Sequence, residues 1–259
     1  MEKKALVRLL DYIPSVISFA AAVAAVVGSP KWDSQASGFA KITPYGWGVM
    51  AIGATALAAS LLIIKRNQKD QTIQRATRER IAAIGKARLL KALGHAVHPF
   101  WNYSIWERTF DVPESPLDLL DPERRKALAS LNLNSKSPYS DGTDTEFRWF
   151  NIIENAAEQG SAQLTTALQI YSAYLPAEVM DAVTKVLYST FLNIRLIGIH
   201  GVVAANTRHD RDWPVKFFWV ANDEMHNRDY SQFWQLLAAA FVACGSELSA
   251  DGKPMFPRY

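Results

Sequence analysis

The residue types best suited to chemistry gather in one short stretch, Asn222-Asp223-Glu224-Met225-His226. Two carboxylates and an imidazole this close together could serve acid–base chemistry or hold a metal ion. Glu224 and His226 are two residues apart, however, and would not share a helical face. Charges at a helix end or in a solvated turn account for the stretch more simply. We therefore assign no catalytic residue, and keep as one hypothesis a membrane-bound enzyme that uses polar residues of 208–226.

A second charged stretch, residues 207–212, precedes it and is expected where a helix ends. Its two guanidinium groups, Arg208 and Arg211, could contact an anionic ligand, because arginine binds carboxylates and phosphates with two parallel hydrogen bonds. A solvated loop is the simpler interpretation of this stretch.

Metal and nucleophile motifs are incomplete. His95 and His98 are three residues apart and could share a helical face, but a third ligand is missing. Glu154 and Glu158 lack the Glu-x-x-His companion of a di-iron bundle. Cys244, the single cysteine, lies in an apolar helical stripe and is expected to be unreactive. The sequence thus predicts no metal, no cofactor and no enzymatic activity.

Composition sets the class of protein. The chain has 259 residues, of which 49% are hydrophobic and 20% charged. These values exclude a disordered chain, a collagen-like repeat and a disulfide-framework peptide. A single cysteine also rules out an intrachain disulfide and favours a reducing compartment for the functional half.

Charge is distributed unevenly along the chain. Residues 65–91 hold nine Lys/Arg against two Asp/Glu, a net of +7, whereas residues 92–259 hold 14 Lys/Arg and 20 Asp/Glu, a net of −6. A polyanion would be repelled by the larger, acidic part. We therefore expect no direct binding of nucleic acid.

Two segments, residues 12–28 and 45–64, are apolar and contain no charged residue. A membrane-spanning helix needs about 20 residues, so we expect spans at about residues 10–28 and 45–64. These spans form a transmembrane hairpin, residues 1–64. The basic residues before and after it place both termini in the cytoplasm. An alternative makes residues 1–28 a cleaved signal peptide, which leaves the second span in the same orientation.

Small side chains are frequent in the second span. In lipid they let helix backbones approach closely, either within the hairpin or between copies in a homo-oligomer. The residues we expect at such contacts are Gly46, Gly48, Gly53, Ala54 and Ala58.

A basic juxtamembrane helix, residues 65–98, is expected to continue from the second span and to end before Pro99. Its charge is typical of a cytoplasmic anchor, while a stalk between subunits or a helix lying on anionic lipid is the alternative. The basic residues nearest the membrane are Lys65, Arg66, Lys69, Arg75 and Arg78.

Residues 99–259 are expected to form a helical domain, so the fold class is all-α. Aromatic residues of 98–116 should be buried, and Asp121 should cap a short helix that reaches about residue 131. Residues 144–175 are helical with a break at Gly160, and Pro176 opens a central helix that runs to about residue 205. His200, within that helix, is expected to be a hydrogen-bonded core histidine. Residues 217–220 form a short strand or a helical turn, and residues 230–244 the last helix.

The arrangement resembles the two-transmembrane effectors of bacterial anti-phage defence systems. The resemblance rests on the hairpin, the basic exit of residues 65–91 and the compact domain, and it covers under half of the chain without a diagnostic motif. It implies a cytosolic domain that senses a protein partner or signal, and a hairpin that assembles and disturbs the inner membrane. The alternative is a passive anchor or adaptor that presents a helical interaction domain.

Overall fold

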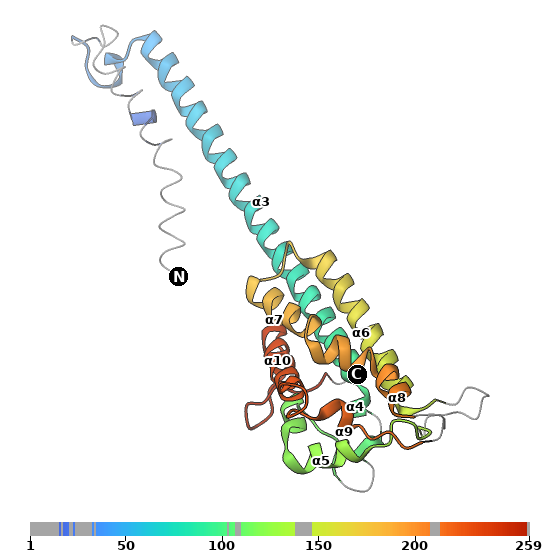
Figure 1. Cartoon of the computed structure of the whole chain (residues 1–259). Helices are drawn as coiled ribbons and strands as arrows, with labels where there is room; N and C mark the ends of the chain where they lie inside the picture. The colour runs from blue at the N-terminus through green and yellow to red at the C-terminus, as the bar shows by residue number, and fades with distance from the viewer. Residues whose placement is uncertain are drawn as a thin grey trace. The chain divides into compact units, whose positions relative to one another are not determined.

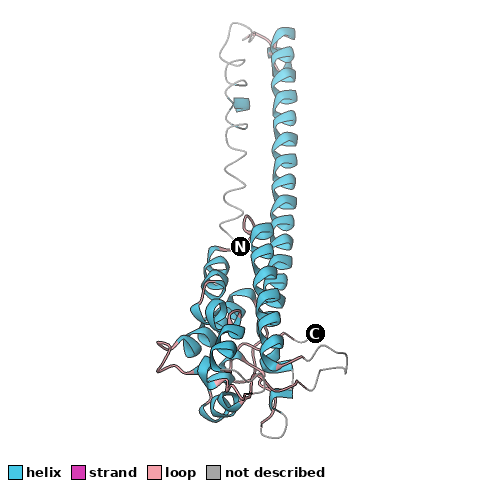
Figure 2. Cartoon of the chain, turned by 45° about the vertical axis from the view of Figure 1, so that its right-hand side comes forward, coloured by secondary structure: helices cyan, strands magenta, loops and turns pink. Residues whose placement is uncertain are grey.

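The protein is represented by a computed structural model. It describes residues 16, 18–20, 23, 33, 35–102, 104–106, 110–137, 147–207 and 213–257. These residues form helices and connecting loops, with isolated bridges but no strand, as Figure 2 shows. The all-α prediction is therefore confirmed for the described part of the chain.

The chain forms two compact units, residues 1–77 and 78–259. The first unit contains the 3-10 helix η1 (Gly38–Lys41) and the beginning of α3 (Pro44–Val97). Thr43 starts α3, because its hydroxyl accepts a hydrogen bond from the amide of Gly46 at 3.2 Å and Pro44 takes the first helical position. Most of the first predicted span, at about residues 10–28, lies outside the described residues, so the pairing of the two spans in a hairpin stays a prediction.

Two helical stretches are long and apolar enough to cross a membrane. One is the beginning of α3, whose most apolar 18-residue segment contains no buried residue, although Gly46 at the start of the helix is buried. The other is Ala177–Asn206, for which the sequence predicts a core helix. In the second unit, 39% of its most apolar segment is buried. Its buried side chains include Val183 and Leu192, which belong to the domain core.

The second unit contains the end of α3 and the remaining helices (Figure 1). These are α4 (Pro99–Asn102), η2 (Ser104–Trp106), η3 (Pro116–Leu120), α5 (Pro122–Ser130), α6 (Trp149–Tyr171), α7 (Ala177–Leu187), the π-helix η4 (Phe191–Leu196), α8 (Ile199–Asn206), α9 (Phe218–Ala221) and α10 (Asp229–Cys244).

Short-range signals placed several of these helices correctly. Asp121 caps α5 as predicted, since its carboxylate accepts hydrogen bonds from the amides of Glu123 and Arg124 at 3.1 and 3.0 Å. Residues 217–220 contribute a helical turn, α9, rather than a strand. The last helix, α10, matches the predicted range to within one residue at its start.

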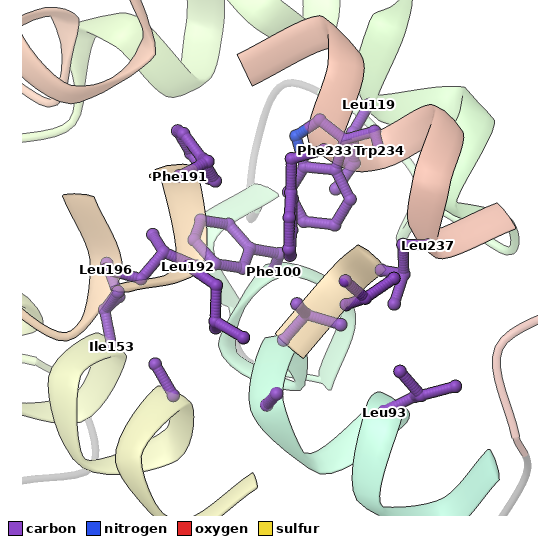
Figure 3. Packing of buried hydrophobic residues seen from close by; sticks show 14 of the residues in the cluster. Leu93, Phe100, Leu119, Ile153, Phe191, Leu192, Leu196, Phe233, Trp234 and Leu237 are labelled. Atoms are coloured by element: carbon purple, nitrogen blue, oxygen red, sulfur yellow. The ribbon is translucent and has the colours of Figure 1, made fainter. Parts of the chain in front are cut away.

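Aromatic side chains form the centre of the second unit (Figure 3). The ring of Phe100 meets that of Trp234 edge-on at 5.4 Å, and Phe191 lies 5.0 Å from Phe233. Trp106 is also buried, and its indole N–H donates to the carbonyl of Phe100 at 2.6 Å. The predicted burial of the connector's aromatic residues is thus confirmed for Phe100 and Trp106.

Helix α6 does not break at Gly160, contrary to the prediction, but runs on to Tyr171. Gly160 lies directly against α3: a Cβ atom built at this position would be only 2.4 Å from Cβ and 2.5 Å from Cα of Ala96. The glycine therefore allows two backbones to cross closely, which needs no change in helical geometry.

The predicted single helix from Pro176 to residue 205 is wrong, because it divides into α7, η4 and α8. At the break, the Ser189 hydroxyl donates to the carbonyl of Val186 at 2.8 Å, and the Asn193 amide donates to that of Leu187 at 2.6 Å. Side chains thus satisfy carbonyls that a continuous helix would have paired with its own amides.

Candidate functional site

Asp223 is held by an ion pair with a neighbouring helix. Its Oδ2 lies 2.9 Å from Nη1 of Arg125, a residue of α5. The same guanidinium donates from Nη2 to the carbonyl of Ala221 at 2.8 Å and lies 5.0 Å from the ring centre of Tyr230. Arg125 therefore joins α5, α9 and α10 at one point.

The carboxylate of Asp223 also fixes the start of α10. It accepts from the amide of Ser231 at 3.1 Å, and the Ser231 hydroxyl donates to it as well. Nearby, the hydroxyl of Tyr230 donates to the carbonyl of Leu119 at 2.8 Å, and burial raises the pKa of this phenol above its usual range. The negative charge of Asp223 is thus engaged in holding helices together.

His226 has a separate set of partners. Its Nε2 lies 2.9 Å from the carbonyl of Trp219, which can only accept, so Nε2 carries the hydrogen. Its Nδ1 must then accept from Nη2 of Arg195, 2.8 Å away. Arg195 belongs to the π-helix η4, so this contact ties η4 to the turn that precedes α10.

The candidate catalytic residues of 222–226 are therefore close in sequence, but each has different contacts in the structure. Asp223 pairs with Arg125, His226 pairs with Arg195, and Glu224 is exposed. Within the described residues, no group of three or more His, Cys, Asp or Glu residues is arranged to hold a metal ion.

Arg208 and Arg211, proposed as ligand contacts, lie outside the described residues.

His200 differs from its prediction. It is exposed on α8 and pairs with Glu154 of α6, instead of lying in the core. The hydrogen bond and the charge of Glu154 raise the pKa of this histidine. The prediction is wrong because the apolar residues around it are buried on another face of the short helix α8. The carboxylates of Glu154 and Glu158, which lie on the neighbouring helix α6, were the sequence feature that could have indicated an acidic partner for His200.

His95 and His98 do share a face, as the spacing indicated. Their rings stack at 4.9 Å, and His98 lies with Nδ1 2.9 Å from the carbonyl of His95. His95 in turn lies 3.0 Å from the side-chain amide oxygen of Gln159 on α6. Burial is the largest cause that lowers the pKa of His98.

These two pKa shifts predict opposite effects of pH on the melting temperature. Because the fold disfavours protonated His98, its contribution to stability should fall as pH drops below about 6.5. Because the fold favours protonated His200, its contribution is present below about 6.5 and should be lost as pH rises through its raised pKa. The variant His98→Asn should lose less stability than the native chain on acidification to about pH 5, and His200→Gln should lose less on a rise to about pH 8.

Differential scanning fluorimetry of the detergent-solubilised chain at several pH values measures both effects. The double variant serves as the control and should combine the two changes. Identical pH profiles for the native chain and both single variants would contradict this prediction.

Cys244 is buried in α10, and burial raises the pKa of its thiol to about 12. The thiolate, which is the reactive form, is therefore scarce at neutral pH. This agrees with the expectation that the cysteine is unreactive.

The predicted membrane-contact residues divide between two sides of α3. Gly46 is buried and Gly53 is half-buried, whereas Gly48, Ala54 and Ala58 are exposed. The juxtamembrane basic residues are all exposed: Lys65, Arg66, Lys69, Arg75 and Arg78.

Neither the protein-family models, the curated proteins nor the solved structures compared with this chain give a match.

Proposed function

We propose that the protein is a membrane-anchored effector. Its helical domain receives a partner protein or signal in the bacterial cytoplasm, and its apolar hairpin then assembles in the inner membrane and disturbs it. The observation that carries this proposal is the apolar beginning of α3, which exposes a row of mainly small side chains that none of the described residues covers.

Helical spacing defines two faces of this segment. The partly covered face holds residues four and three apart that are buried or half-buried: Gly46, Met50, Gly53, Leu57, Ser60 and Ile64. The second face has the same spacing and is fully exposed, and we call it the open face: Gly48, Ala51, Thr55, Ala58 and Leu62.

The open face supports assembly between copies. A Cβ atom built at Gly48 would meet nothing within 4 Å. In lipid, small residues at such spacing let a second helix approach closely, and van der Waals packing then stabilises the pair. If activation stabilises the assembled state by a few kcal/mol relative to the unassembled state, the populations of these two states are inverted.

Charge supports the proposed orientation. The basic side chains that follow Ile64 are exposed, as they would be at the cytoplasmic surface of a membrane. Residues 92–259, whose net charge is negative, would then lie in the cytoplasm. Because this charge repels nucleic acid, we expect the partner to be a protein.

The substitution Gly48→Leu tests this function. It adds bulk only to the open face, so we expect membrane insertion to persist and depolarisation of activated cells to fall at least tenfold. A voltage-sensitive dye measures depolarisation, and alkaline extraction of membranes measures insertion.

The matched control is Ile52→Leu, one helical turn after Gly48, at a residue that is 72% exposed. This substitution leaves the side-chain volume unchanged. It should depolarise cells as the native chain does. Undiminished depolarisation by Gly48→Leu would refute assembly through the open face.

An adaptor is the second candidate, because the domain surface also exposes large apolar side chains such as Tyr188, Trp219 and Met225. Such residues are common at protein–protein interfaces. An adaptor would keep its activity when the hairpin is exchanged for an unrelated one, whereas an effector would lose it.

A further inference from the structure

The guanidinium of Arg195 is only partly used by the free chain. Its one acceptor among the described residues is Nδ1 of His226, and its Nε is buried without a hydrogen-bond partner. A buried donor without a hydrogen-bond partner destabilises the free chain. The side chain as a whole is half-buried, so part of it reaches the surface.

Unusual backbone surrounds this arginine. Arg195 lies in the π-helix η4, a conformation that occurs often at functional sites. The turn that carries His226 continues into Asn227 and Arg228, which have left-handed φ values of 51° and 65°. Such strain persists where the surrounding structure holds it, and it is frequent at binding sites.

Large apolar side chains next to these residues in the chain are exposed. Ile194, which precedes the arginine, is 58% exposed, and Met225, which precedes His226, is 52% exposed. Trp219, whose carbonyl orients His226, is 41% exposed. Tryptophan, methionine and arginine are among the residues that are enriched in protein interfaces.

We propose that these residues form a docking surface, the Arg195 patch (Ile194, Arg195, Trp219, Met225 and His226), for a partner protein that presents a carboxylate beside an apolar side chain. The carboxylate accepts hydrogen bonds from the guanidinium, and the apolar side chain packs on Trp219 and Met225. This inference rests on the proposed role of the helical domain as a receiver and gives that role a surface.

Charge favours a single carboxylate over a polyanion. Residues 92–259 carry a net charge of −6, which opposes approach of a nucleic acid or an anionic membrane. One carboxylate placed against Arg195 gains a charge-assisted hydrogen bond without that long-range repulsion. His226 acts here as a positioning residue, because its lone pair fixes one edge of the guanidinium.

Photocrosslinking of the full chain in cells of its host tests the proposal. The photoreactive amino acid p-benzoylphenylalanine is placed at Met225 and, as a control, at Val242 of α10, which is 54% exposed. We expect a covalent adduct with another protein from position 225 and none from position 242. The adduct should fall at least tenfold in Arg195→Gln and in Trp219→Ala, while circular dichroism shows an unchanged fold.

Mass spectrometry of the adduct then identifies the crosslinked segment of the partner. We expect an Asp or Glu in it whose exchange for Lys abolishes the adduct and whose combination with Arg195→Glu restores it. No adduct, an adduct with a second copy of this chain, or an adduct indifferent to Arg195 would overturn the proposal.

The outcome is separable from that of the effector proposal. If the adduct forms as expected but Gly48→Leu still depolarises cells, the Arg195 patch stands and the effector mechanism fails. If depolarisation depends on Gly48 but no Arg195-dependent adduct forms, the effector proposal stands and the patch fails.

Discussion

Replacing Gly160 with leucine should lower the stability of the helical domain by about 3 kcal/mol, the upper end of the usual range for overpacking. For a domain of this size, such a loss lowers the melting temperature by about 6–12 °C. The reason is the 2.4–2.6 Å distance from a Cβ at Gly160 to Cβ, Cα and N of Ala96, two of which are backbone atoms. Helices α3 and α6 would have to separate to accommodate any side chain.

Alanine at Gly160 gives the sharper comparison. Gly→Ala within a helix normally stabilises by about 0.5–1 kcal/mol, but here the added methyl group meets backbone and should destabilise. Gly201→Ala is the matched control, because a Cβ at Gly201 of α8 meets nothing within 4 Å. Thermal unfolding followed by circular dichroism should therefore give a lower melting temperature for Gly160→Ala and a higher one for Gly201→Ala than for the native chain. A melting temperature of Gly160→Ala at or above that of the native chain would show that this crossing is not tight.

Exchange of Asp223 for alanine should destabilise the domain by about 3 kcal/mol, as expected when one partner of a partly buried ion pair is removed. The loss leaves Arg125 without its counter-charge and deprives the Ser231 amide of its acceptor. Glu224→Ala, at the neighbouring exposed position, should change stability by less than about 0.5 kcal/mol.

Chemical unfolding followed by tryptophan fluorescence measures both variants. A double-mutant cycle with Arg125→Ala should recover a coupling energy of about 1–3 kcal/mol. If Asp223→Asn instead leaves stability unchanged and abolishes a measurable reaction, the structural role fails and the membrane-bound enzyme hypothesis regains support.

Local signals explain which helices could be foreseen. Asp121 and Pro122 mark the start of α5, because a cap and a proline at the first position act within one turn of chain. The apolar stripe of α10, which includes Phe233 and Leu237, likewise reports burial directly through its spacing.

Tertiary contacts explain the rest. The sequence predicts a helix break at Gly160 because it does not show that Ala96 lies against this glycine. Just before and within the π-helix that carries Arg195, Ser189 and Asn193 donate hydrogen bonds to the carbonyls of Val186 and Leu187, and the sequence pattern does not reveal these partners. The sequence predicts a core position for His200 because the apolar residues around it do not indicate which side of α8 faces Glu154.

Because the thiol of Cys244 is buried, we expect the native chain to react only slowly with thiol-specific labels. Maleimide reagents should modify the native chain only when α10 opens, so the labelling rate reports the equilibrium for that local unfolding. A cysteine introduced at an exposed position, such as Phe39, would be labelled far faster than the native one. Membrane-impermeant maleimide applied to whole cells could then establish on which side of the bilayer each segment lies, without first removing the natural thiol.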